Sequence, residues 1–118
     1  MDLNNILIGS EDPQRLVSYY RRLFGEPTWN MGGYIGWQVG TGGFVIGAHD
    51  QVHGQNPEPG RIIWNVTSQD VRSDFERLKA AGARVIRDPY ELGEGDQAGT
   101  IATFADPDDN YFQLVSPM

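Results

Sequence analysis

Hydrophobic residues recur with the 3.6-residue period of an amphipathic helix in two stretches of the chain. The spacing predicts helices over Asp12–Phe24 and Gln69–Ala81. A glycine follows each stretch, Gly25 in the first case and Gly82 in the second, as is common where a helix ends. The two apolar stripes consist of Leu16, Tyr20 and Leu23, and of Val71, Phe75 and Leu78.

Shorter stretches are apolar or alternate between apolar and polar residues, which is typical of β-strands. Fifteen glycines and seven prolines separate them and indicate many turns. The predicted strands are Leu3–Ile8, Tyr34–Val39, Phe44–His49, Arg61–Val66, Arg84–Ile86, Thr100–Ala105 and Tyr111–Val115, with Pro27–Asn30 as a weaker candidate.

The same order of elements occurs twice: a strand, a helix that ends at a glycine, a short strand and a hairpin. This repeat predicts an α+β fold of two βαβββ modules. Module one spans about residues 1–50, a linker rich in proline and glycine spans about 51–60, and module two spans about 61–118. One module offers too small a core to be a separate domain, so we expect the two to pack as a single domain.

The alternation of side chains along each strand separates a core face from a second, mixed face. In the predicted strands of module two, Trp64 and Phe112 belong to the apolar face under the helix. Ile63, Asn65, Tyr111 and Gln113 share the other face. Apolar walls with a few polar groups are typical of a small-molecule site. Trp37 and Tyr111 are candidates to stack on a planar ligand, or alternatively belong to the core or to a dimer interface.

Composition and charge narrow the function classes. The net charge of −7 disfavours nucleic-acid binding, and it would favour a cationic ligand, although acidity also serves solubility. The chain has no cysteine, which excludes thiolate metal sites and suggests a reducing compartment. Because neither a signal peptide nor a membrane-spanning stretch is visible, we expect a cytoplasmic protein without membrane contact.

Three clusters of polar residues have a structural and a functional interpretation. His49, Asp50 and His53 could bind a metal or act as an acid–base set, but a solvated loop is the favoured interpretation. The aspartates of 106–109 could suggest calcium, yet the proline among them favours a turn. The segment Asp88–Gly99, with its acidic residues Glu91, Glu94 and Asp96, is either a flap over a pocket or a long connection.

The turn Asp106-Pro107-Asp108-Asp109-Asn110 between two short strands, together with Asp12-Pro13, Ala80-Ala81-Gly82 and the repeated βαβββ order, resembles the vicinal oxygen chelate superfamily. This superfamily includes glyoxalases, bleomycin-resistance proteins and extradiol dioxygenases. Its members usually carry glycine where this chain has Asp109, a residue that tolerates the left-handed conformation. The resemblance implies two modules whose sheets curl into a half-open cup, and a homodimer.

Metal-using members that the chain resembles hold a divalent ion with four side chains on the concave face, usually histidine or glutamate and sometimes glutamine. Carried over by position, these fall on Asn5, Ile46, Ile63 and Gln113, with the registers of Ile46 and Ile63 open by one residue. Isoleucine has no donor atom, and carboxamides are weak ligands for a dication. We therefore predict that the site has no metal, and no other cofactor.

Three functions remain open. The favoured one is a metal-free small-molecule-binding protein of the bleomycin-resistance type, which sequesters an antibiotic or a metabolite. Its predicted ligand-binding residues are Asn5, Trp37, Ile46, Ile63, Asn65, Tyr111 and Gln113. The alternative is a metal-dependent lyase, isomerase or dioxygenase with non-standard ligands such as His49 and His53. Metal-free catalysis by Tyr111 ranks last, because the concave face offers no convincing general base.

Overall fold

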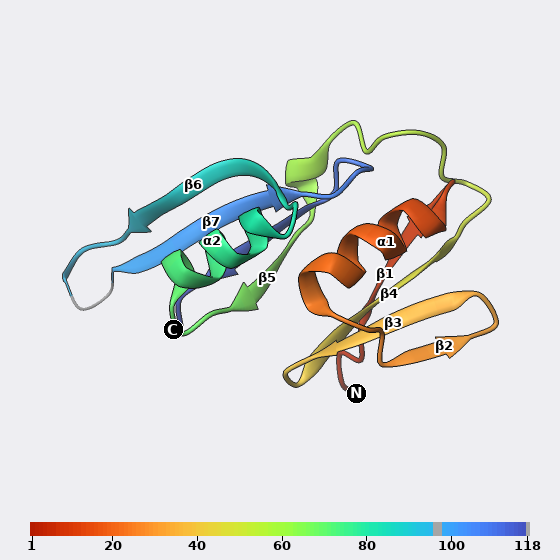
Figure 1. Cartoon of the computed structure of the whole chain (residues 1–118), viewed down its shortest axis with the longest axis horizontal. Coiled ribbons are helices and arrows are strands. Elements are labelled where there is room, and N and C mark those ends of the chain that lie inside the picture. The colour runs from red at the N-terminus through yellow and green to blue at the C-terminus, as the bar shows by residue number, and fades with distance from the viewer. Residues whose placement is uncertain (96–97, 118) are drawn as a thin grey trace. The chain divides into compact units, whose positions relative to one another are not determined.

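The computed structural model describes residues 1–95 and 98–117. The chain divides into two compact units, Met1–Gln55 and Asn56–Met118 (Figure 1). The boundary between them falls within the predicted linker. Each unit has one four-stranded sheet of its own and one α-helix.

The first unit contains β1 (Ile6–Ser10), α1 (Pro13–Phe24), β2 (Trp29–Met31), β3 (Tyr34–Val39) and β4 (Gly42–Ala48). Its four strands form one sheet in the order β1-β4-β3-β2. The first strand pairs with the last in parallel, whereas the other pairs are antiparallel.

The second unit repeats this plan. It contains a short 3₁₀ helix η1 (Pro59–Arg61), β5 (Ile63–Thr67), α2 (Val71–Ala80), β6 (Arg84–Leu92), β7 (Gly99–Ala105) and β8 (Tyr111–Val115). The sheet has the order β5-β8-β7-β6, and β5 pairs with β8 in parallel. The predicted α+β class with two βαβββ modules is therefore confirmed.

The two helices begin at aspartates that behave differently. Asp70 caps α2, because its carboxylate accepts a hydrogen bond from the backbone N–H of Ser73 at 3.1 Å. Asp12 stands at the same place before α1 but forms no such side-chain bond. Gly25 ends α1 with a φ of 83°, a conformation that favours glycine.

An aromatic cluster fills the core of the first unit between α1 and its sheet. The rings of Trp37 and Phe44 stack at 5.0 Å, and the ring of Tyr20 from α1 lies 5.0 Å from Phe44. These three side chains are almost completely buried. The face of the sheet that carries Trp37 and Phe44 is therefore the one covered by α1 (Figure 1).

The core of the second unit has the same construction. Phe104 and Phe112 stack at 5.3 Å, and Phe75 from α2 stacks on Phe104 at 5.5 Å. Trp64 stacks on Phe112 at 5.0 Å, on the helix side as its position in the strand predicts. Each sheet thus has a face that packs against its helix, and we call the opposite face of each sheet its helix-free face.

Two strands differ most from their predicted ranges. β1 begins at Ile6 rather than Leu3, and β6 continues to Leu92 instead of ending at Ile86. Pro89 does not end β6 because this strand lies at the edge of its sheet, and the pairing with β7 is irregular on both sides of Arg87. Much of the predicted flap Asp88–Gly99 is therefore strand, and Asp96 lies outside the described residues.

No helix within residues 1–95 and 98–117 has the length and hydrophobicity needed to cross a membrane.

Candidate functional site

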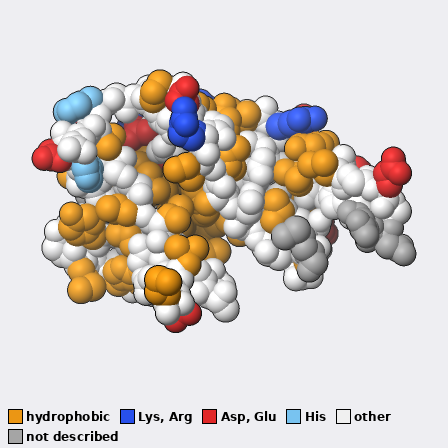
Figure 2. Space-filling model, turned by 180° about the vertical axis from the view of Figure 1, so that it is seen from behind, with side chains coloured by type: hydrophobic (Ala, Val, Ile, Leu, Met, Phe, Trp, Pro, Cys, Tyr) orange, Lys and Arg blue, Asp and Glu red, His pale blue; other side chains and the backbone are white. Residues whose placement is uncertain are grey.

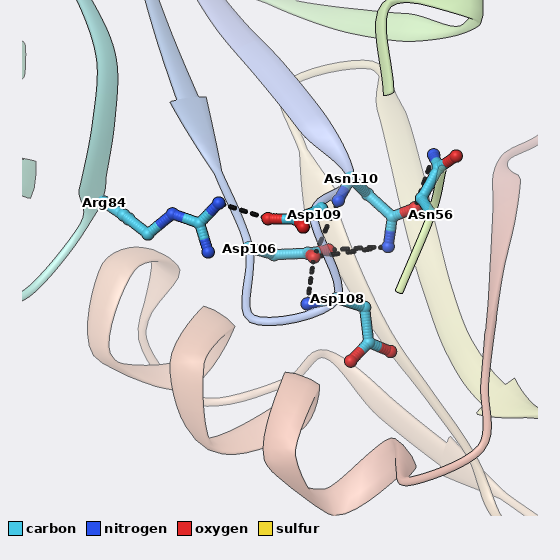
Figure 3. Close-up of polar contacts among 6 residues, drawn as sticks. All are labelled: Asn56, Arg84, Asp106, Asp108, Asp109 and Asn110. Atoms are coloured by element: carbon cyan, nitrogen blue, oxygen red, sulfur yellow. Dashed lines mark hydrogen bonds and ion pairs between the residues drawn. The ribbon is translucent and has the colours of Figure 1, made fainter. Parts of the chain in front are cut away.

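The turn between β7 and β8 is organised by one buried carboxylate (Figure 3). Oδ1 of Asp106 accepts hydrogen bonds from the backbone N–H groups of Asp108 at 2.8 Å and Asn110 at 3.0 Å. Oδ2 accepts another at 3.0 Å from the side-chain amide of Asn110. The carboxylate of Asp106 therefore serves the turn itself, which is the structural interpretation of this acidic cluster.

Other contacts extend this turn to neighbouring segments of the second unit. Asp109 takes the left-handed conformation with a φ of 64°, as predicted, and its carboxylate pairs with Arg84 at the start of β6 (Figure 3). Asn56 donates from its side-chain amide to Oδ1 of Asn110 at 3.2 Å, and its backbone N–H donates to the carbonyl of Asp108. These contacts connect the turn to the start of β6 and to the segment that contains Asn56.

On the second sheet, four predicted site residues come together. Ile63 is paired with Tyr111, and Asn65 with Gln113, across the parallel strands β5 and β8. These positions alternate with Trp64 and Phe112, which face α2. Ile63, Asn65, Tyr111 and Gln113 therefore share the helix-free face, as their alternation predicts.

Polar side chains form a row across this face. Gln113 is paired with Asn65 of β5 on one side and with Thr103 of β7 on the other. Its Nε2 donates a hydrogen bond to Oγ1 of Thr103 at 3.0 Å, and only 5% of Thr103 is exposed. Thr103 was not predicted, although its alternation with Phe104 in a predicted strand indicates the same face.

In the first unit, two predicted site residues face the helix instead. Trp37 stacks on Phe44 in the core, and its Nε1 donates to the carbonyl of Gly25 at 2.9 Å. Ile46 is completely buried and two positions from Phe44 on the same strand, so it shares that face. Trp37 therefore lies in the core, the alternative that its sequence left open, and not among the ligand-binding residues, and the prediction that Ile46 lines the helix-free face is wrong.

The error at Ile46 is one of register. Ile6 pairs with Phe44 in the first sheet as Trp64 pairs with Phe112 in the second. Phe44 therefore corresponds to Phe112, not to Tyr111, and the counterpart of Gln113 is Val45. Valine has no donor atom, so the correction does not create a metal ligand.

Asn5 lies immediately before β1 and is half-buried. Its side-chain amide donates a hydrogen bond to the neighbouring Asn4. The residue is therefore next to the first strand rather than in it, and a side-chain partner already occupies one of its polar atoms.

Aromatic residues that the prediction did not assign to the site cover the helix-free face of the first sheet. Trp29 pairs with Gly36 and lies so close that a methyl group there would overlap the indole. Tyr34 lies over Gly47 in the same way, since a Cβ on that glycine would be 2.5 Å from the ring. Seen from behind, hydrophobic side chains gather on the part of the surface that also carries the histidines (Figure 2).

The residues at the four family positions do not fit a divalent metal. After the correction of register they are Asn5, Val45, Ile63 and Gln113, which supply two neutral carboxamides and no charge. In the described part of the chain, no three His, Cys, Asp or Glu side chains lie close enough to hold an ion. The absence of a resident metal nevertheless stays a prediction.

The histidines of the first unit bond to nearby residues of the loop and of the segment that leads into α1. Nδ1 of His49 accepts from the backbone N–H of Gln51 at 3.2 Å, and Nδ1 of His53 lies 3.5 Å from the carboxylate of Glu11. The side chain of His53 is 77% exposed. This arrangement matches the solvated-loop interpretation rather than a ligand pair.

Comparison with known proteins supports the fold. Residues 5–115 match the family model of the glyoxalase-like domain. A glyoxalase/bleomycin resistance protein/dioxygenase family enzyme from Burkholderia phytofirmans PsJN is similar over 100% of both chains, with 20% identity and a TM-score of 0.74. A glyoxalase/bleomycin resistance protein/dioxygenase from Alicyclobacillus acidocaldarius has 16% identity and a TM-score of 0.75, over 98% of this chain and 90% of that one.

A glyoxalase-related enzyme from Fulvimarina pelagi is also similar, with 20% identity and a TM-score of 0.72 over 98% of this chain and 88% of its own. None of the curated proteins compared with the sequence matches it. At these identities the solved structures establish the fold, and the family model establishes the relationship. The chain belongs to the family of glyoxalase-like domains, within the vicinal oxygen chelate superfamily.

Proposed function

We propose that this chain is a metal-free binding protein for a small molecule, an antibiotic or a metabolite, which it holds on the helix-free face of the second sheet. The observation that carries the proposal is the polar row Asn65–Gln113–Thr103. Apolar or aromatic residues border the row on the same face of the strands, at Ile63 and Tyr111 on one side and at Ile101 and Val115 on the other.

The chemistry of this row suits recognition rather than catalysis. A carboxamide offers both a carbonyl acceptor and an amide donor, so Asn65 and Gln113 can orient an uncharged polar group of a ligand. The bond from Gln113 to Thr103 fixes one end of that amide. The ring of Tyr111 adds a surface for stacking, which contributes about 1 kcal/mol beyond the buried area.

The proposal is tested by titration calorimetry of the full chain against a panel of metabolites and antibiotics. For compounds that bind, we expect Gln113→Leu and Asn65→Leu to weaken affinity about tenfold, because each leaves a ligand polar group without its partner. Gln14→Leu, at an exposed position of α1, is the matched control and should leave affinity unchanged. The absence of binding across the panel, or equal affinity in all variants, contradicts the proposal.

The metal-free part of the proposal has a separate test. Elemental analysis of gently purified protein should find less than stoichiometric zinc, nickel, manganese and iron, because the donor set lacks charged ligands. A stoichiometric metal would replace this proposal by the metal-dependent enzyme of the same superfamily.

We also propose that the protein is a cytoplasmic homodimer. Support comes from the absence of cysteine and from exposed hydrophobic residues in the first unit, with Leu7 54% and Met31 70% exposed. Sedimentation velocity over a range of concentrations should give the mass of two chains. A monomer at micromolar concentration would contradict this.

A further inference from the structure

Building on the proposed function, we infer that the ligand carries a carboxylate, which binds Arg87 at the end of the polar row. Arg87 of β6 is paired with Thr103 of β7. Since Thr103 is in turn paired with Gln113, and Gln113 with Asn65, one polar side chain from each of the four strands stands in line. The row thus ends in a cation.

Tyr90 holds this cation in place. The guanidinium carbon of Arg87 lies 3.7 Å from the centre of the Tyr90 ring. Tyr90 is paired with Ile101, the neighbour of Thr103 on the same face of β7. A guanidinium group that stacks on a ring leaves its N–H edge available, and this edge matches a carboxylate with two parallel hydrogen bonds.

Arg87 differs from the nearby arginines Arg72 and Arg84, because their charges are paired with carboxylates. Arg84 is paired with Asp109 and Arg72 with Glu91, so their charges are already balanced. Among the residues that the structure describes, no carboxylate forms an ion pair with Arg87, including the adjacent Asp88. In a chain with a net charge of −7, this is a local positive site, and it points to an anionic ligand rather than a cationic one.

The geometry of the sheet also limits the length of the ligand. Neighbouring strands lie about 4.8 Å apart, so Arg87 and Gln113, which are two strands apart, are separated by about 10 Å. The ligand therefore has a carboxylate at one end and, about 10 Å away, a polar group that binds the carboxamides of Asn65 and Gln113. An apolar body joins these two groups and contacts Ile101 and Val115.

The experiment compares hydroxyaryl-alkyl carboxylates with their uncharged primary amides, for example 4-(4-hydroxyphenyl)butyrate with 4-(4-hydroxyphenyl)butyramide and their homologues with chains of two to six carbons. Titration calorimetry on the full chain measures the ratio of the two dissociation constants. We expect the acid to bind at least about tenfold more tightly than the amide, and this preference to weaken as salt is added.

Variants test which residues produce the preference for the acid over the amide. Arg87→Met should bring the ratio of acid to amide affinity close to one, and Arg87→Lys should leave an intermediate value because lysine lacks the fork. Tyr90→Leu removes the ring and should lower the ratio, whereas Tyr90→Phe keeps the ring and should keep the ratio. A loss of stability alone would weaken the binding of acid and amide alike and would not change their ratio. Arg77→Met is the control, since it removes the same charge from α2 and should keep the full ratio.

Three results would overturn the inference. A ratio near one in the unmodified protein, or a ratio that Arg87→Met does not change, shows that Arg87 does not bind the carboxylate. If uncharged panel compounds then bind in a manner that depends on Gln113, the proposed binding function stands and only the carboxylate inference fails. If no compound of either set binds, both fail.

Discussion

A single buried carboxylate organises the turn that closes the second unit. Backbone N–H groups in a short turn have few backbone partners, and Asp106 accepts two of them directly. Because Asp106 is fully buried, these bonds are shielded from solvent in the folded protein. Asp106 therefore contributes strongly to the stability of the turn, beside the contacts of Asp109 and Asn56.

We expect Asp106→Ala to lower the free energy of unfolding by about 3 kcal/mol, because buried N–H groups lose a charged acceptor. Asp106→Asn keeps one oxygen and should lower it by about 1–2 kcal/mol. Denaturation by urea measures both changes. Asp50→Ala, at a side chain that is 96% exposed, is the control, and an equal loss there would contradict the assignment.

Residue-level prediction from the sequence succeeded where alternation within one strand was sufficient. Ile63, Asn65, Tyr111 and Gln113 lie on one face as predicted, because a strand has a fixed period of two. Ile46 was misplaced because its position depended on aligning two hairpins with different turns. A shift of one residue in such an alignment transfers a side chain to the opposite face.

Among the elements, the two helices have different beginnings. The carboxylate of Asp70 bonds to the N–H of Ser73, whereas Asp12 forms no side-chain cap bond. The hydroxyl of Ser10 accepts from the N–H of Asp12 instead. The two modules share their order of elements, but they do not share the bonds that start their helices.

This difference gives a comparison within one chain. Asp70→Ala should lower the free energy of unfolding by about 1 kcal/mol, since α2 loses a capping bond. Asp12→Ala should lower it much less. Thermal unfolding followed by circular dichroism measures both, and equal losses would show that the side-chain bond of Asp70 adds nothing.

Glycine in the first sheet allows aromatic rings to lie on it. Gly36→Ala should destabilise the protein by about 1–3 kcal/mol, because the added methyl group overlaps the indole of Trp29 and forces it to move. Gly42→Ala is the control in the same sheet, with its nearest atom 4.0 Å from the added carbon. Chemical denaturation measures the loss of stability, and tryptophan fluorescence reports the movement of the indole of Trp29. Similar losses of stability in Gly36→Ala and Gly42→Ala would contradict the steric explanation.

The range of β6 shows where element prediction from local signals ends. Pro89 and the following acidic and glycine residues indicate a loop, and the strand was predicted to stop at Ile86. The structure keeps pairing through Leu92 because an edge strand needs hydrogen bonds on one side only. Arg87 was missed for this reason, since its place on a strand depends on pairing with β7.

For the whole molecule, the two units repeat one core design. An aromatic pair stacks across adjacent strands in each, Trp37 with Phe44 and Phe104 with Phe112. The weak repeat in the sequence therefore corresponds to a repeated arrangement of side chains in the two cores. That level was predictable because hydrophobic period and element order determine it, whereas the identity of a ligand depends on side-chain register across strands.

Units of about 60 residues have little core, so we expect the two to unfold together. Asp106→Ala, in the second unit, should then reduce the hydrogen-exchange protection of amides in α1 as well as in α2. Mass spectrometry of exchanged peptides measures this. Protection of α1 that stays unchanged while α2 loses protection would show two independently folding units.

The parallel pairing of first and last strands also has a consequence during protein synthesis. β8 is made after the other three strands of its sheet, yet it is an inner strand, between β5 and β7. Within the part of the chain that the structure describes, β5 pairs with β8 alone, so the sheet of the second unit cannot be completed until Val115 has emerged from the ribosome. All four strands of the first sheet have been made once β4 has emerged, so the first sheet has its full set of strands earlier in synthesis than the second.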